Sequence, residues 1–142
     1  MSDKVFLDTN IILYLCSSNE PEKQVRAKEL FDLHDEIIIS TQVINEFINV
    51  ASRKFGFSWE KLLTTTKDLA TICTVQYIDL SIIENAMLVA SRFRYSYYDS
   101  LMIAAATASK ATILYSEDLQ HDHSVRQQLK IINPFKSSFA VA

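Results

Sequence analysis

Short apolar runs alternate with longer stretches of helical spacing along most of this 142-residue chain, and this alternation restricts the possible folds. The runs are rich in β-branched or aromatic residues, are bounded by polar residues, and have the length of buried strands. They cover residues 5–7, 36–40, 74–78, 111–115 and 130–134. No two of them are joined by a tight turn, so the strands must pair in parallel through crossover connections. We therefore predict an α/β fold with three layers, α/β/α, around a central, mostly parallel sheet of about four or five strands.

Helical spacing fills the intervals between these runs. Helices are predicted over residues 11–15, 21–34, 41–54, 59–70, 82–93 and 99–108. Ser58 is predicted to cap the fourth helix, and Ser81 with Glu84 three residues later forms a capping-box pattern for the fifth. The sixth has alanine on every side, which is typical of a tightly packed internal helix.

The length and the apolar content of 49% indicate one globular domain over residues 1–142. No apolar run reaches transmembrane length and the N-terminus lacks a signal-peptide pattern, which favours a cytoplasmic protein with no membrane contact. Two alternatives stay open for residues 135–142, either disorder or docking through Phe135 and Phe139. Cys16 and Cys73 lie in apolar segments without metal-ligand spacing, so we expect buried thiols.

The charge pattern limits the kinds of nucleic-acid binding that we expect. A net charge of −3 and a pI of 5.6 argue against a protein that coats nucleic acid by charge alone. A local basic patch remains open, with candidates Arg53, Lys54, Lys61, Arg92, Arg94, Lys110 and Arg126. Because Gly56 is the only glycine, glycine-rich phosphate-binding loops are excluded.

Four acidic residues occupy positions that stability alone explains poorly. Asp8 and Asp118 each follow an apolar run, so both belong to the carboxyl edge of the sheet, where parallel α/β folds bind ligands. Glu46 lies at the margin of an apolar helical arc, and Asp99 shares a helix face with apolar residues such as Met102. Two carboxylates about 4 Å apart repel by roughly 4 kcal/mol at an effective dielectric near 20, so convergence of all of them requires a cation.

The chemistry of that cation follows from the ligand type. Oxygen ligands with little histidine or thiol nearby suit Mg²⁺ or Mn²⁺, which keep some waters and bind substrate phosphate. Such ions orient a water and stabilise the leaving oxygen of a phosphodiester displacement. The predicted reaction is metal-dependent hydrolysis of a nucleic-acid backbone.

Four segments together carry a resemblance to a known family. They are Leu7-Asp8-Thr9-Asn10, Val43-Ile44-Asn45-Glu46-Phe47, Tyr98-Asp99-Ser100-Leu101-Met102-Ile103-Ala104-Ala105-Ala106 and Leu114-Tyr115-Ser116-Glu117-Asp118-Leu119. In order, spacing and total length the chain resembles the PIN-domain ribonucleases, and it is most similar to the VapC-like toxins of bacterial toxin–antitoxin pairs.

The resemblance implies a Mg²⁺- or Mn²⁺-dependent endoribonuclease that cleaves RNA, forms homodimers and is inhibited by a cognate antitoxin protein. By position, the acidic set that would bind metal and carry out catalysis is Asp8, Glu46, Asp99 and Asp118. Thr9 and Ser116 match supporting hydroxyl positions, and Asn10 matches the polar residue after the first acid. Similar proteins often have a glycine where this chain has Asp122, which either adds to the acidic set or replaces Asp118.

Each candidate residue also has a structural interpretation. Asp8 can begin a turn in which Thr9 or Asn10 caps the next helix, and Ser96 with Asp99 has capping-box spacing. Glu46 can be a solvated helix residue, and Ser116 with Asp118 can form a polar turn in which Glu117 competes with Asp118 for the acidic position. We interpret His34, His121 and His123 as surface or loop residues. Tyr95, Tyr97 and Tyr98 either stack on bases or, preferably, pack against the protein.

Two other functions compete with the ribonuclease. A phosphoacceptor domain would use Asp8 as its nucleophile. Such a domain usually has a second carboxylate two residues after the nucleophile, where this chain has Asn10, and a lysine at a later strand end, where this chain has Tyr115 and Ser116. A catalytically silent PIN-like interaction module would bind only a partner protein. Ile11, Leu15, Trp59 and Leu63 are more apolar than one small core needs, and we predict that they form an exposed groove for an antitoxin segment.

Overall fold

Five parallel strands form the centre of the sheet in the computed structural model, which describes residues 3–119, 124–125 and 128–136. The strands are β1 (Lys4–Leu7), β2 (Glu36–Ser40), β3 (Thr74–Gln76), β4 (Ile113–Tyr115), β5 (Ser124–Val125) and β6 (Leu129–Ile132). Their order is β3-β2-β1-β4-β6-β5, and β5 alone pairs antiparallel. The predicted parallel sheet is confirmed. The edge strand β5 was not predicted, because two residues are too short to show a period.

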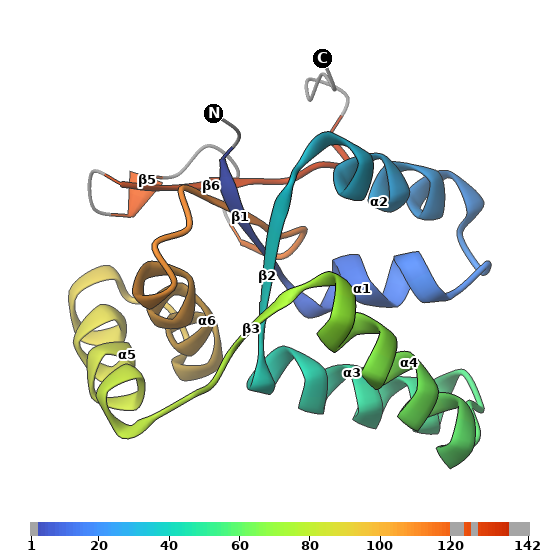
Figure 1. Ribbon diagram of the computed structural model, residues 1–142. Coiled ribbons are helices and arrows are strands. Elements are labelled where there is room, and N and C mark those ends of the chain that lie inside the picture. The colour runs from blue at the N-terminus through green and yellow to red at the C-terminus, as the bar shows by residue number, and fades with distance from the viewer. Residues whose placement is uncertain (1–2, 120–123, 126–127, 137–142) are drawn as a thin grey trace.

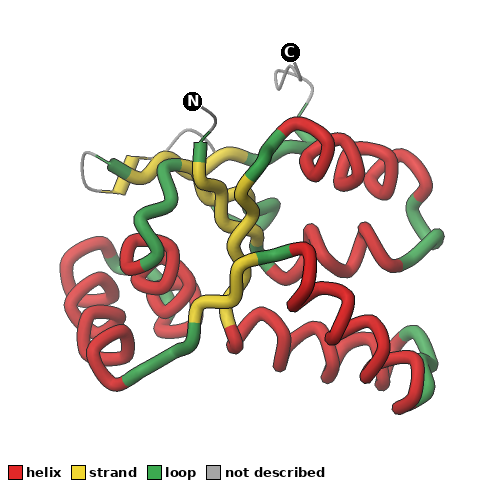
Figure 2. Tube along the Cα trace, viewed as in Figure 1, coloured by secondary structure: helices red, strands yellow, loops and turns green. Residues whose placement is uncertain are grey.

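Within the described part of the chain, six helices cover the two faces of this sheet. They are α1 (Thr9–Cys16), α2 (Pro21–Leu33), α3 (Thr41–Lys54), α4 (Trp59–Ile72), α5 (Leu80–Phe93) and α6 (Tyr97–Ala108). In Figure 1, α5 and α6 lie on one side of the sheet and α1 to α4 lie on the other. Figure 2 shows the strands as a single layer between these two groups of helices, which confirms the three-layer prediction.

The helix starts differ from the predicted ones in three places. Asp8 itself caps α1, so the prediction of Thr9 or Asn10 as the cap is wrong. Asp79, and not Ser81, caps α5 by accepting the Ile82 backbone N–H at 2.9 Å. The extended backbone of Asp79 aims its carboxylate at the helix start, whereas Ser81 already lies inside the helix. Ser96 caps α6 as its spacing indicated, and α6 begins at Tyr97, two residues earlier than predicted.

The core confirms the internal position of α6 and corrects the predicted apolar groove. Residues 100–106 of α6 are all buried, as expected for a helix packed between a sheet and α5. Ile11 is fully buried and Leu15 is partly buried, whereas Trp59 and Leu63 are 72% and 58% exposed. The predicted groove is therefore wrong in its α1 half, because α1 lies against α2 and α3 and its apolar side chains complete the core.

Two cysteines and one histidine also have defined environments. Cys73 is buried, Cys16 is partly buried, and neither forms a disulfide. Burial raises the pKa of Cys16 to about 11 and that of Cys73 to about 12, so both remain protonated thiols. His34 lies in the loop directly after α2, as predicted, and its Nε2 lies 2.8 Å from the Tyr115 hydroxyl in a partly buried position.

The end of the described chain docks on α1. The Phe135 ring packs edge-on against Tyr14, with 5.1 Å between the ring centroids. Phe139, the other residue expected to dock the tail, lies outside the described residues. No helix in the described ranges combines the length and the apolar character needed to cross a membrane.

Candidate active site

The adjacent strands β1 and β4 place two of the predicted site residues side by side. Leu7 is in register with Tyr115, so the residues that follow them leave the sheet together. The Asp8 backbone N–H donates to the Tyr115 carbonyl at 3.0 Å. One oxygen of the Asp8 carboxylate accepts the Thr9 backbone N–H at 2.6 Å, and the other accepts the Ser116 hydroxyl at 2.8 Å. Both oxygens of Asp8 are thus held in fixed directions.

Helix α3 brings Glu46 to the same place, because α3 begins directly after β2. The Thr9 hydroxyl donates to Glu46 Oε2 at 3.1 Å, and Gln42 Nε2 donates to Glu46 Oε1 at 3.1 Å. Sequence analysis did not single out Gln42. Its position four residues before an acid on a helix was the available signal, since residues i and i+4 are neighbours on the helix surface.

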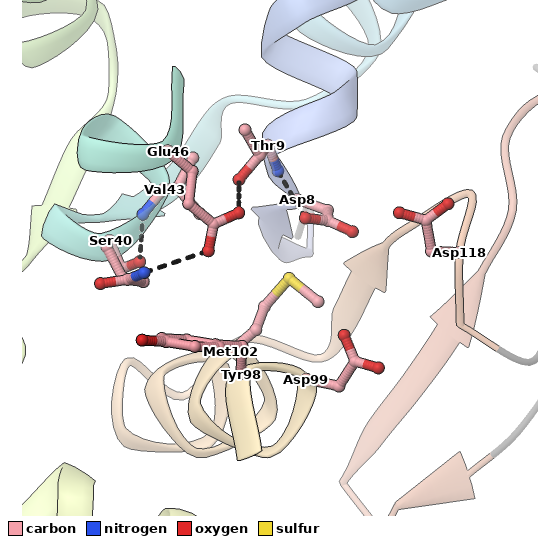
Figure 3. Close-up of a pocket in the computed structure, with 10 residues that line it drawn as sticks. Asp8, Thr9, Ser40, Val43, Glu46, Tyr98, Asp99, Met102 and Asp118 are labelled. Carbon is pink, nitrogen blue, oxygen red and sulfur yellow. Dashed lines mark hydrogen bonds between the residues drawn. The ribbon is translucent and has the colours of Figure 1, made fainter. Parts of the chain in front are cut away.

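The remaining two acids complete an open cleft, which we name the carboxylate cleft (Figure 3). The described residues that line it are Asp8, Thr9, Ser40, Gln42, Val43, Glu46, Tyr98, Asp99, Met102 and Asp118. Asp118 is exposed, and its Oδ2 accepts Asn10 Nδ2 at 2.7 Å. The cavity volume of about 80 Å³ holds several waters or a hydrated cation.

The electrostatics of the cleft are unfavourable without a cation. Asp8 is only 8% exposed. Burial raises its pKa to about 6, against the lowering effect of the hydrogen bonds from Ser116 and Thr9. The charges of Asp118 and Glu46 raise it further. Four of the described lining residues are acids and none is basic, so no side chain there offsets the negative charge.

The donor set fits a hard divalent cation. All of the charged groups in the carboxylate cleft are carboxylates, which favours Mg²⁺ or Mn²⁺ over metals that prefer nitrogen or sulfur ligands. Within the described ranges, no three His, Cys, Asp or Glu side chains are grouped closely enough to hold a metal ion together.

The neighbours of Asp118 in the sequence have contacts that define their roles. Glu117 does not compete with Asp118, because its carboxylate accepts the Tyr14 hydroxyl and pairs with the Lys23 ammonium instead. The Ser116 hydroxyl also accepts the Leu119 backbone N–H at 3.2 Å, so the predicted polar turn is present beside the acidic cleft. Asp122, His121, His123 and Arg126 lie outside the described residues.

One of the three tyrosines packs as expected and two do not, and the described basic candidates do not line the cleft. Tyr95 is partly buried against the core, as predicted. Tyr97 and Tyr98 are 39% and 63% exposed, so the packing expected for them is wrong. The described basic candidates are all exposed, and none is among the residues that line the carboxylate cleft. They are Arg53, Lys54, Lys61, Arg92, Arg94 and Lys110.

Comparison with known proteins gives a family match and several structural matches. The family model of the PIN domain matches residues 5–124. The VapC20 toxin of Mycobacterium tuberculosis, which cleaves the sarcin-ricin loop, is 20% identical with a TM-score of 0.68, over 81% of this chain and 90% of that chain. A toxin–antitoxin complex from Klebsiella pneumoniae is 17% identical with a TM-score of 0.70, over 94% of this chain and 99% of that chain.

A third structural match has the same fold at a similarly low sequence identity. VapBC-1 of nontypeable Haemophilus influenzae is 23% identical with a TM-score of 0.58, over 80% of this chain and 86% of that chain. No curated protein matches the sequence. At these identities the structural matches establish the fold.

Proposed function

The chain belongs to the PIN domain family, and from this premise we propose that it is a Mg²⁺- or Mn²⁺-dependent endoribonuclease. The observation that carries the proposal is the carboxylate cleft, where Asp8, Glu46, Asp99 and Asp118 come together from four separate parts of the chain with no basic side chain among the described lining residues. Such a cleft is unfavourable by itself and becomes favourable with a divalent cation.

The residues divide into those that would hold the cation and those that orient them. Asp8, Glu46, Asp99 and Asp118 would hold it, and when bound it would supply positive charge that activates a water and stabilises the leaving oxygen. Three hydrogen-bond donors fix the acids: Ser116 orients Asp8, Thr9 orients Glu46, and Asn10 orients Asp118. In an in-line displacement, the attacking and leaving oxygens lie on opposite sides of the phosphorus atom. Fixed carboxylates would hold the cation in a defined position relative to both oxygens.

We further propose that this ribonuclease is the toxin of a toxin–antitoxin pair and acts in the cytoplasm on RNA. Structural relatives include a sarcin-ricin-loop-cleaving toxin and toxin–antitoxin complexes, which supports this role. The partners would be a cognate antitoxin protein and a second copy of the chain. Exposed apolar side chains on α4 and α5 support partner contacts: Trp59, Leu63, Leu80, Met87 and Leu88 are each more than half exposed.

The two competing functions fit the cleft less well. A phosphoacceptor domain needs a lysine near the nucleophile, and no lysine is among the described residues that line the cleft around Asp8. A silent interaction module has no use for four acids that share one cleft. It remains the alternative that the following experiment tests.

The first test is the melting temperature of the purified protein, freed of any partner, with EDTA and with Mn²⁺. We expect Mn²⁺ to raise the melting temperature, since a ligand that binds the native state stabilises it by roughly 2.7 kcal/mol at 100 times its dissociation constant. Asp99→Asn should respond less to Mn²⁺. Without metal the variant should melt at least as high as the wild type, because no residue in the described ranges donates a hydrogen bond to the Asp99 carboxylate.

An RNA cleavage assay completes this test. Wild-type protein should cleave RNA in the presence of Mn²⁺ and not with EDTA, and Asp99→Asn should lose this activity. Asp68→Asn, which changes an exposed acid on α4, serves as the matched control and should behave as wild type. If Mn²⁺ leaves the melting temperature unchanged and no RNA is cleaved, the silent interaction module replaces the ribonuclease.

A further inference from the structure

We propose that the exposed ring of Tyr98, supported by Tyr97, is a stacking platform for an unpaired nucleobase beside the carboxylate cleft. This inference rests on the proposed ribonuclease function and adds to it a residue that contacts the base next to the cleaved bond.

The exposure of these two rings is unusual for α6. Residues 100–106 of this helix are all buried, whereas Tyr98 is 63% exposed and Tyr97 is 39% exposed in its first turn. The two rings contact each other edge to face, with 5.4 Å between the centroids and an interplanar angle of 64°. Tyr97 therefore supports Tyr98 from the side, and the outer surface of Tyr98 stays available to a ligand.

The position of Tyr98 relates it directly to the acids. It lines the carboxylate cleft and immediately precedes Asp99 in the helix. In Figure 3 the Tyr98 and Asp99 side chains leave the start of α6 in different directions, with Met102 between them. A substrate that places a phosphate among the acids would thus extend its neighbouring nucleotide along the rim of the cleft, where Tyr98 lies.

The size of the cleft decides where the base must go. A cavity of about 80 Å³ accommodates a hydrated ion and a phosphate oxygen, but not a nucleobase as well. The base attached to the cut phosphate therefore lies on the rim. The apolar lining residues Val43 and Met102 are 3% and 8% exposed and offer no flat surface, whereas the Tyr98 ring does.

Charge favours stacking as the source of affinity at this place. The described lining residues include four acidic side chains and no basic one, so the phosphate backbone gains little binding energy from the cleft walls themselves. Stacking on an aromatic ring is available to every base and requires an unpaired base whose face is free. Bases inside a duplex are stacked on their neighbours, so the Tyr98 ring can take only a base that is unpaired.

The test uses a short single-stranded RNA that contains one 2-aminopurine, whose fluorescence falls when it stacks on an aromatic ring. Binding is measured with Mn²⁺ in the Asp99→Asn background, which keeps the RNA intact. We expect binding with quenching in this parent protein. Tyr98→Ala should weaken binding by about tenfold, a typical loss for one stacked base, and remove the quenching. Tyr98→Phe should retain both, because the ring and not the hydroxyl provides the platform.

Two controls make the outcome specific. Tyr77→Ala removes a tyrosine that is 73% exposed but is not among the cleft-lining residues, and it should bind like the parent. The same RNA annealed to its complement should bind more weakly and show no added quenching. Unchanged binding and quenching in Tyr98→Ala, or equal binding of the duplex, would overturn the platform.

The cleavage assay separates this inference from the function on which it rests. If wild-type protein cleaves RNA and Tyr98→Ala cleaves it with unchanged KM, the platform fails and the ribonuclease stands. If the platform is present, Tyr98→Ala should raise KM more than it lowers kcat. If the wild type neither binds nor cleaves RNA, both proposals fail.

Discussion

Asp8 combines a structural role, the cap of α1, with the chemical role that we propose for it in the carboxylate cleft. Its carboxylate caps α1 through the Thr9 backbone N–H, and it also lines the carboxylate cleft beside Glu46 and Asp118. A cap needs only one carboxylate oxygen, and here the other one is held by the Ser116 hydroxyl. The capping interaction therefore fixes the acid in place, in the orientation that the proposed metal binding would use.

The buried charge of Asp8 makes stability depend on pH. The pKa of Asp8 is raised from 3.8 to about 6 in the folded protein, so the native state binds this proton more tightly than the unfolded chain. Without metal, stability should fall as pH rises from about 4 to about 6, by roughly 3 kcal/mol for a shift of this size. Urea unfolding of wild-type protein and Asp8→Asn in EDTA, from pH 4 to pH 7, measures this contribution as the difference between the two curves.

Mn²⁺ provides the internal comparison for this pH series. A bound cation stabilises the ionised carboxylate, so the loss of stability with rising pH should shrink when Mn²⁺ is present. A difference between wild type and Asp8→Asn that stays constant across this pH range would show that the Asp8 carboxyl titrates normally.

Individual residues were predicted unevenly, because their contacts join distant parts of the chain. The resemblance assigned supporting positions to Thr9, Asn10 and Ser116, and each donates a hydrogen bond to an acid from another segment. Glu117 stands next to Asp118 and yet turns to Tyr14 and Lys23, far away in the sequence. No local pattern distinguishes these two neighbouring acids.

At the level of the secondary-structure elements, helix starts were the weakest part of the prediction. Ser81 and Glu84 have capping-box spacing, but Asp79 caps α5 and the helix begins at Leu80. Asp and Ser are similarly good caps. The path of the chain out of β3 decides between them, because the cap must have a non-helical backbone.

This difference gives a direct test by substitution. Asp79→Ala should destabilise the protein by about 1 kcal/mol, the usual cost of losing a helix cap. Ser81→Ala should change the free energy of unfolding by less than about 0.5 kcal/mol, since this side chain is exposed within the helix. Urea unfolding of both variants measures the two costs. Equal costs, or a larger cost at Ser81, would mean that the helix starts later than in this structure.

On the scale of the whole molecule, the sheet topology explains how distant acids meet. Asp8 and Asp118 follow the neighbouring strands β1 and β4, and α3 starts where the next strand over, β2, ends. Because these strands are parallel, the residues after them lie at the same edge of the sheet. Helix α6 adds Asp99 from the opposite face, so the cleft requires all three layers.

The outer surface carries a separate prediction about the antitoxin that we propose as a partner. Trp59 and Leu63 are one turn apart on α4 and are 72% and 58% exposed. If the antitoxin covers this face, the double substitution Trp59→Ala with Leu63→Ala should weaken its binding by at least about 2 kcal/mol, as expected for a buried tryptophan at an interface. Isothermal titration calorimetry with the co-expressed and purified antitoxin measures the change.

A matched variant elsewhere on the surface controls for this effect. Val25→Ala changes an exposed apolar residue on α2 and should leave the affinity unchanged. Both variants should unfold like the wild type, because the substituted side chains are exposed. If the double variant binds the antitoxin with wild-type affinity, the α4 face is not part of the interface.

The sequence alone determined the six helices, the five parallel strands and the acidic candidates described here. Local periodicity specifies which segments are strands and which are helices, and a polar residue directly after a buried strand marks the ligand-binding edge. The order of these elements then restricts the fold to a parallel sheet between two helical layers, as observed. For these features the information lies within a few neighbouring residues.

Only the tertiary structure decided what each side chain touches across the chain. It buried Ile11 and left Trp59 exposed, although both are apolar residues in segments with helical spacing. It also placed the exposed ring of Tyr98 on the rim of the carboxylate cleft and raised the pKa of Asp8 by burial. Packing, solvent exclusion and the sum of nearby charges depend on segments that are distant in sequence, so they arise only when the layers assemble.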